Sequence, residues 1–157
     1  MDFTRKIRWV KDGHQTPNPK TSCYAGVVSC ESIWIALTYA ALHKIDFKAA
    51  DIQNAYLQSP SSEKHFIYCG EEFGLEHYGS VALVRRSLYG GKAAGRDFWH
   101  HLHSFLEHLQ FKSSRADPDV WIQPARRKDG TKYYEYVLLC TYDCLVISDN
   151  AEKILRS

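Results

Sequence analysis

An apolar run near the end of the sequence constrains the fold more than any other feature. Residues 137–147 read VLLCTYDCLVI, with aliphatic and β-branched side chains in both halves. Such a pattern is typical of two buried strands joined by a turn. One carboxylate, Asp143, lies at its centre. Because an acid in apolar surroundings needs compensation for its charge, and a metal ion is a common source, the run predicts a strand–turn–strand with a metal-ligating acid.

A second acid has a similar setting about ninety residues earlier. Asp51 lies in the stretch AADIQNAYL at residues 49–57. Two acids presented by separate strands are typical of a divalent-metal site for phosphoryl chemistry, in which carboxylate oxygens hold the ions. The sequence therefore predicts that Asp51 and Asp143 meet in the folded chain.

Composition limits the class of protein. The 157 residues are 45% hydrophobic and 13% aromatic, which is enough for one ordinary domain with a core and argues against disorder. The five cysteines show no C-x-x-C spacing, which argues against a disulfide scaffold or a zinc module and favours a reducing compartment. There is no run of about eighteen apolar residues and no signal-peptide core, so we expect an intracellular, soluble protein without a membrane partner.

The charge balance is mildly basic, and its distribution is uneven. The formal net charge is +2. Clustered cations are compatible with a polyanionic partner such as a nucleic acid, but solvated surface charge explains each cluster equally well. The three clusters comprise Arg5, Lys6, Arg8 and Lys11, then Arg85, Arg86, Lys92 and Arg96, and finally Arg126, Arg127 and Lys128.

Hydrophobic periodicity predicts a mixed α/β (α+β) fold in a single domain over residues 1–157. Helical spacing covers residues 29–43, where Ser29 or Ser32 is a suitable cap, and residues 92–109. Another helix begins near residue 151. We expect strands over residues 6–10, 81–85, 119–122 and 134–139, extended chain over 46–57 and a loop over 58–62.

Four motifs carry a resemblance to a known family. They are DIQNAYL at 51–57, SLYGGK at 87–92, ADP at 116–118 and LLCTYD at 138–143. In order and spacing they resemble the Ty1/copia-type retrotransposon reverse transcriptase, and the match runs from Lys6 to about Leu155. The resemblance implies an antiparallel palm sheet backed by helices, with partial fingers and without thumb or RNase H. It also implies an RNA-directed DNA polymerase within a Pol polyprotein, located in cytoplasmic virus-like particles or the nucleus.

The family's chemistry is two-metal nucleotidyl transfer at three carboxylates. The resemblance makes Asp51 and Asp143 the catalytic metal ligands for Mg²⁺, with Tyr142 in the place of the remaining acid. A neutral phenol is a poor substitute for that carboxylate. In the alternative alignment Asp143 is the first acid of the pair and Cys144 takes the place of the second. We prefer the ungapped alignment, because a slip of one residue turns every side chain of a strand to the other face.

Both alignments leave two of three carboxylates. We therefore expect an impaired two-ion site and a copy that is inactive or nearly so. The alternative is a non-catalytic remnant that binds nucleic acid, and a more distant one is a protein-interaction domain.

The resemblance also assigns substrate contacts. Tyr56 matches the steric gate against the sugar 2′-hydroxyl, although an aromatic there is also compatible with a core position. Lys6 and Arg8 match cations that meet the triphosphate, although their alternation equally fits a solvated strand face. Lys92 matches an element that shapes the nucleotide and template pocket. The implied partners are an RNA template, a DNA primer or RNA–DNA hybrid, and a dNTP.

Two groups of possible metal ligands are better explained structurally. Cys140 and Cys144 are interpreted as small apolar core residues. Four histidines crowd residues 100–108, but no acid or cysteine completes a ligand set, so we expect them on a surface or groove. They are His100, His101, His103 and His108.

Overall fold

The computed structural model describes residues 9–156. Within this range the chain forms two compact units. Unit 1 contains residues 9–24 and 54–101, and unit 2 contains residues 25–53 and 102–156. Neither unit is continuous in sequence, and the prediction of one domain over residues 1–157 stays a prediction. The described part of the chain has no helix that is long and apolar enough to span a membrane.

Unit 2 is built on one antiparallel sheet with the strand order β1-β7-β6-β5-β4. The central pair β6–β7 is the predicted strand–turn–strand, which the structure confirms. The apolar residues 137–139 of β6 and 146–147 of β7 are buried in succession, which is typical of strands covered on both faces. The strands are β1 (Phe47–Asp51), β4 (Lys112–Ser113), β5 (Val120–Arg126), β6 (Lys132–Cys140) and β7 (Asp143–Ile147).

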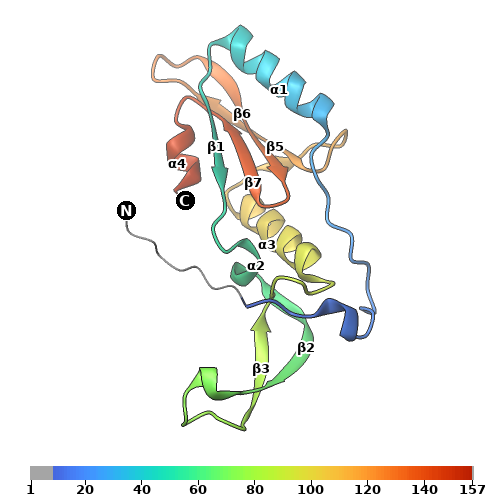
Figure 1. Cartoon of the computed structure of the whole chain (residues 1–157). Coiled ribbons are helices and arrows are strands. Elements are labelled where there is room, and N and C mark those ends of the chain that lie inside the picture. Colours follow the sequence, from blue (N-terminus) through green and yellow to red (C-terminus); the bar gives the residue numbers. More distant parts are fainter. Residues whose placement is uncertain (1–8, 157) are drawn as a thin grey trace, which may run out of the picture. The chain divides into compact units, whose positions relative to one another are not determined.

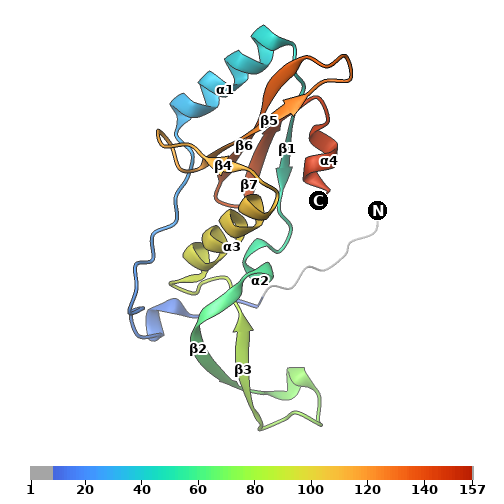
Figure 2. The same cartoon turned by 180° about the vertical axis from the view of Figure 1, so that it is seen from behind.

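Helices cover both faces of this sheet (Figures 1 and 2). On one face, Ala36 and Ala40 of helix α1 (Cys30–His43) pack in a cluster with Leu138 and Ile147. On the other face, α4 (Ala151–Leu155) and the last residues of α3 (Ala94–His108) pack over a cluster that includes Trp121. Leu138 and Trp121 retain 1% of their exposed area, and Ile147 none, so the core lies directly on β5, β6 and β7.

Unit 1 contains a two-stranded antiparallel hairpin, β2 (Pro60–Tyr68) with β3 (Val81–Arg86). It also contains the short helix α2 (Ala55–Gln58), the 3₁₀ turns η1 (Gly13–Gln15) and η2 (Glu71–Phe73), and the start of α3. The N-terminal segment joins it through a parallel bridge between Val10 and Tyr89 and through a hydrogen bond from Lys11 N to Tyr89 O of 2.7 Å.

Most predicted elements are confirmed with shifted ends. Helix α1 begins one residue after its cap Ser29, whose hydroxyl accepts a hydrogen bond from Ser32 N. Helices α3 and α4 and strands β3, β5 and β6 also lie where the pattern predicts them. The expected strand at residues 6–10 falls outside the described residues, except for Trp9 and Val10.

Two expectations are wrong at the boundary between the units. The extended chain expected over residues 46–57 ends at Asp51, because Asn54 adopts a left-handed backbone (φ 53°) and α2 follows. The loop expected over residues 58–62 is instead the start of β2 at Pro60. Proline is tolerated as the first residue of a strand, so its presence marks a strand start here rather than a loop.

Candidate metal-binding site at the β6–β7 hairpin

The β6–β7 hairpin closes through a two-residue turn. Cys140 pairs with Asp143, so Thr141 and Tyr142 form the turn. Thr141 has a φ of 57°, and Tyr142 is not in the positive-φ region. A positive φ at the first turn position alone is the pattern of a type II′ turn, which normally has glycine there. The turn therefore holds a β-branched residue in a strained backbone conformation.

Asp51 and Asp143 meet across neighbouring strands. Asp51, the last residue of β1, is the direct antiparallel partner of Asp143, the first residue of β7. Directly opposed side chains project from the same face of a sheet, with Cβ atoms roughly 4.5–5.5 Å apart. Both residues are exposed. The predicted meeting of the two acids is thus present in the fold of unit 2.

The two carboxylates lack a cationic partner in the described chain. Within residues 9–156, no ion pair or hydrogen bond engages either of them. No group of three or more His, Cys, Asp or Glu side chains in that range could hold a metal ion. Like charges directly opposed on adjacent strands destabilise a sheet. The arrangement therefore offers two oxygen ligands and an unbalanced negative charge.

The expected burial of Asp143 is wrong. Val146 and Ile147 of the same strand are 1% and 0% exposed, but Asp143 lies at the strand end beside the turn and is exposed. The core covers the middle of β7 and does not reach the hairpin end. Burial of Asp143 is therefore no argument for a bound cation. The argument that remains is the like charge of Asp51 on the adjacent strand.

The two other hairpin positions differ in what they face. Tyr142 is 42% exposed in the turn, and its carbonyl accepts a hydrogen bond from Ile52 N at 2.9 Å. Cys144 follows Asp143 and therefore faces the opposite side of the sheet, where its thiol donates to Ala50 O at 3.6 Å. Burial raises the pKa of the Cys144 thiol, with a smaller contribution from the charge of Asp143. Cys144 therefore does not share the face of the two acids.

Backbone hydrogen bonds hold the hairpin at Leu139. Its carbonyl accepts from Val28 N at 2.9 Å, and its N–H donates to Asp119 O at 3.0 Å. Val28 directly precedes Ser29, the cap of α1. The side chain of Asp119 contacts His103. The hairpin end is thus tied to both α1 and the β4–β5 connection.

Asp117, from the ADP motif, fixes the start of α1. Its carboxylate accepts hydrogen bonds from Ser29 N (2.9 Å), Ser29 Oγ (3.0 Å) and Ser32 Oγ (2.7 Å). Partial burial acts to raise the pKa of this carboxyl, but the hydrogen bonds from Ser29 and Ser32 outweigh it and lower the pKa. The motif therefore has a structural role in unit 2.

One of the four histidines has an acidic partner that the sequence pattern does not indicate. His103 Nε2 lies 3.1 Å from Asp119 Oδ1, and its ring meets Trp121 edge-on with centroids 4.8 Å apart. The sequence reasoning missed this pair because Asp119 lies sixteen residues beyond His103, outside the helix. The other three histidines are exposed, as predicted.

Tyr56 and Lys92 belong to unit 1, whereas the acids belong to unit 2. The Tyr56 ring lies 4.8 Å from that of Tyr89 and 6.0 Å from that of Phe98, centroid to centroid. Tyr56 thus packs in an aromatic cluster, which was the alternative to the gate. Its role as a gate and the role of Lys92 in the nucleotide pocket stay predictions, and Lys6 and Arg8 lie outside the described residues.

Lys92 is tied to the N-terminal segment. Its ammonium donates to Thr16 O at 2.7 Å and to Asn18 Oδ1 at 2.9 Å. Lys92 also lines a cavity of about 530 Å³ with Lys11 and Gly90. Burial lowers the pKa of Lys11, the nearby charge of Lys92 lowers it further, and Glu63 at 3.8 Å opposes both. Sequence reasoning grouped Lys11 with surface cations and missed this half-buried pair of lysines.

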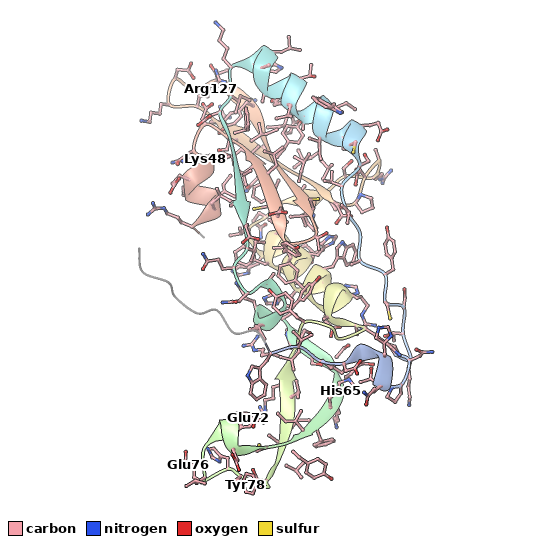
Figure 3. All side chains as sticks on the ribbon, viewed as in Figure 1. Lys48, His65, Glu72, Glu76, Tyr78 and Arg127 are labelled. Atoms are coloured by element: carbon pink, nitrogen blue, oxygen red, sulfur yellow. The ribbon has the colours of Figure 1, made fainter. Side chains whose placement is uncertain are left out.

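A larger cavity of about 910 Å³ in unit 2 contains none of the predicted site residues. Its charged lining residues include Arg126, Arg127, Lys128, Asp129, Glu135 and Asp149. Arg127, labelled in Figure 3, lies 3.0 Å from Asp149, and Tyr133 donates to Glu135 at 2.8 Å. The opposed acids remain the candidate site, because this cavity contains none of the residues that the sequence predicts for it.

Comparison with known proteins adds one relative. The chain is 25% identical over 136 residues to "Retrovirus-related Pol polyprotein from transposon TNT 1-94" of Nicotiana tabacum, which covers 85% of this chain and 10% of that protein. The chain thus spans about a tenth of the length of this relative. No protein-family model matches the chain, and no solved structure does. The likeness supports an origin related to part of a transposon Pol polyprotein, in a chain with an α+β fold.

Proposed function

We propose that this chain is the fingers-and-palm part of an RNA-directed DNA polymerase from a Ty1/copia-type retrotransposon polyprotein, and that this copy has lost nucleotidyl transfer. The observation that carries the proposal is the direct opposition of Asp51 and Asp143 at one end of an antiparallel sheet, with Tyr142 in the adjoining turn. The likeness to a transposon Pol polyprotein supports the same origin.

The donor set fits a divalent cation that prefers oxygen. Mg²⁺ is commonly held by one or two carboxylates and keeps several waters. Asp51 and Asp143 are exposed, adjacent and without a protein cation in the described chain, so they would hold such an ion. Bound Mg²⁺ supplies charge stabilisation of the attacking and leaving oxygens in phosphoryl transfer. The Tyr142 phenol adds no carboxylate for a second ion, which is the physical reason for the expected loss.

The substrate contacts complete the proposal. Tyr56 acts as the gate against a 2′-hydroxyl, while Lys6, Arg8 and Lys92 attract the triphosphate of the dNTP and the template strand. The pairing of Lys92 with Lys11 around one cavity supports an anion-attracting role for unit 1.

Primer extension tests the proposal. The 157-residue chain is incubated with an RNA template, a DNA primer, dNTPs and either Mg²⁺ or Mn²⁺. We expect no extension from the natural chain and measurable extension from the variant Tyr142→Asp. The matched control is Tyr134→Asp, which places an acid at an exposed tyrosine of β6, away from the turn that holds Tyr142. Activity of the natural chain at polymerase-like rates refutes the loss of function.

The second candidate is a remnant that binds nucleic acid without catalysis. The lysine pair around the cavity of unit 1 favours it. This function predicts salt-dependent binding to an RNA–DNA hybrid by the natural chain and by Tyr142→Asp alike, with no extension by either. Absence of hybrid binding contradicts both candidates and favours a protein-interaction domain.

A further inference from the structure

The β2–β3 hairpin has one face on which large apolar side chains are exposed. Phe66 pairs with Leu83, and Tyr68 pairs with Val81, so the four side chains project from one face. Phe66 and Tyr68 are 65% and 83% exposed, and their apolar partners are about half exposed. The intervening residues of both strands are half-buried on the opposite face. Exposed neighbouring aromatics of this kind mark an interaction surface.

Cations continue this face toward one end of the hairpin. Lys64 precedes Phe66 by two residues and Arg85 follows Leu83 by two, and both are exposed. Alternation places both on the apolar face, although the register of β2 is irregular between Pro60 and His65. The acid of this stretch, Glu63, is on the opposite face, where it contacts His65 at 2.8 Å. We call the exposed side the outer face of the hairpin. It comprises Lys64, Phe66, Tyr68, Val81, Leu83 and Arg85.

Acids gather at the other end. Glu71, Glu72 and Glu76 lie in the connection between the two strands, and Figure 3 shows Glu72 and Glu76 there beside Tyr78. The outer face therefore has Lys64 and Arg85 at one end and the aromatic rings next to them, and the acids of the connection lie beyond its other end. A polyanion would place its charge at the Lys64–Arg85 end and its apolar parts on the rings.

We propose that the outer face binds single-stranded RNA or DNA. Bases stack on the rings of Phe66 and Tyr68, while phosphates meet Lys64 and Arg85. Alternate residues of a strand are roughly 6.8 Å apart, a spacing that lets successive unstacked bases reach successive rings. Aromatic platforms on small sheets bind single strands in this way, since every base has a stacking face.

The surface differs from the polymerase site. It shares with the proposed function only the class of partner, because it uses none of the paired acids and takes a single strand rather than a hybrid. Failure of primer extension therefore leaves the proposal intact, and failure of single-strand binding leaves the polymerase assignment intact.

Fluorescence anisotropy measures the binding. Labelled oligo(U) and oligo(dT) of about twelve nucleotides are titrated with the natural chain, Phe66→Ala and Tyr68→Ala. Each substitution is expected to weaken binding about tenfold, the usual effect of losing one stacking ring. Tyr78→Ala is the matched control, because Tyr78 is an exposed aromatic of the same hairpin outside the outer face, and it should bind as the natural chain does. Similar affinities for the two oligomers indicate recognition through bases and phosphates, and a preference for oligo(U) indicates contact with the 2′-hydroxyl.

Charge and position are tested separately. Lys64→Ala and Arg85→Ala should each reduce the slope of log K against log salt by about 0.7, the value for one phosphate of a single strand. Photocrosslinking of the natural chain to 4-thiouridine RNA should give adducts within residues 64–68 and 81–85.

Three results overturn the proposal. The first is equal affinity of Phe66→Ala, Tyr68→Ala and Tyr78→Ala. The second is the absence of single-strand binding by the natural chain. The third is self-association of the natural chain that Phe66→Ala abolishes in sedimentation, because that result makes the outer face a contact between protein copies.

Discussion

At the scale of single residues, the opposed acids make a prediction about stability. Asp51→Asn removes one of two like charges that face each other across β1 and β7. We expect the variant to be more stable than the natural chain by about 0.5 kcal/mol in metal-free buffer. Urea unfolding measures this. Glu107→Gln is the control, because it neutralises an exposed acid on α3 that opposes no other acid in this sheet. Equal effects of the two substitutions contradict the prediction.

The same pair predicts a response to metal. A ligand that binds the folded chain alone raises its stability by mass action. Mg²⁺ or Mn²⁺ should therefore raise the urea midpoint of the natural chain and leave that of Asp51→Asn unchanged. A similar rise in both proteins shows that the ions act elsewhere. This measurement does not depend on catalysis, so it tests the site even in an inactive copy.

Thr141 makes a second prediction at this scale. Its φ of 57° in the hairpin turn is a conformation that glycine adopts without strain. Thr141→Gly should stabilise unit 2 by about 1 kcal/mol. Thr131→Gly should instead destabilise, because Thr131 does not have a positive φ and glycine adds only freedom to the unfolded chain. The two variants are compared by thermal and urea unfolding.

At the scale of elements, Asp117 links the start of α1 to the β4–β5 connection. Asp117→Asn removes the charge that strengthens the hydrogen bonds from Ser29 and Ser32, and should cost about 1 kcal/mol, the usual net worth of a hydrogen bond. Because the folded pKa of Asp117 is lowered, its contribution is complete above the unfolded value of about 4 and is lost as pH falls through the folded pKa. Unfolding at graded pH should show a smaller loss of stability in acid for Asp117→Asn than for the natural chain.

Gly90 links the N-terminal segment to the start of α3. A Cβ at Gly90 would lie 2.1 Å from Lys11 O, and its φ is +81°. Gly130, in the β5–β6 turn, has a φ of +88° but open space around a Cβ. Gly130→Ala should therefore cost about 1 kcal/mol from backbone strain alone. Gly90→Ala adds a steric clash and should cost roughly 1–3 kcal/mol more. Equal unfolding free energies for the two variants contradict the contact with Lys11.

Some elements of this fold are predictable from the sequence pattern and others are not. Helix α1 was predictable because its apolar residues recur with helical spacing after the cap Ser29. The β6–β7 pair was predictable because two apolar runs flank a short polar segment. Strand β2 was missed since its first residues are polar and follow Pro60. The pairing of Asp51 with Asp143 was expected, but their exposure was not. The apolar sequence of residues 137–147 does not indicate where along the strands the core ends. The contact between His103 and Asp119 depends on tertiary packing, which periodicity does not encode.

At the scale of the whole molecule, charge distribution decides whether the chain can bind an RNA–DNA hybrid, as the proposed function requires. The net charge of +2 is too small to attract a polyanion by itself, so binding needs clustered cations such as Lys11 and Lys92. Contact with three phosphates would give a slope of log K against log salt of about −2.7 for a duplex, or roughly a 40-fold loss between about 50 and 200 mM salt. Titration of a blunt RNA–DNA hybrid measures this slope. A slope near zero means that the basic residues are solvated surface charge, and it contradicts hybrid binding as a function of this chain.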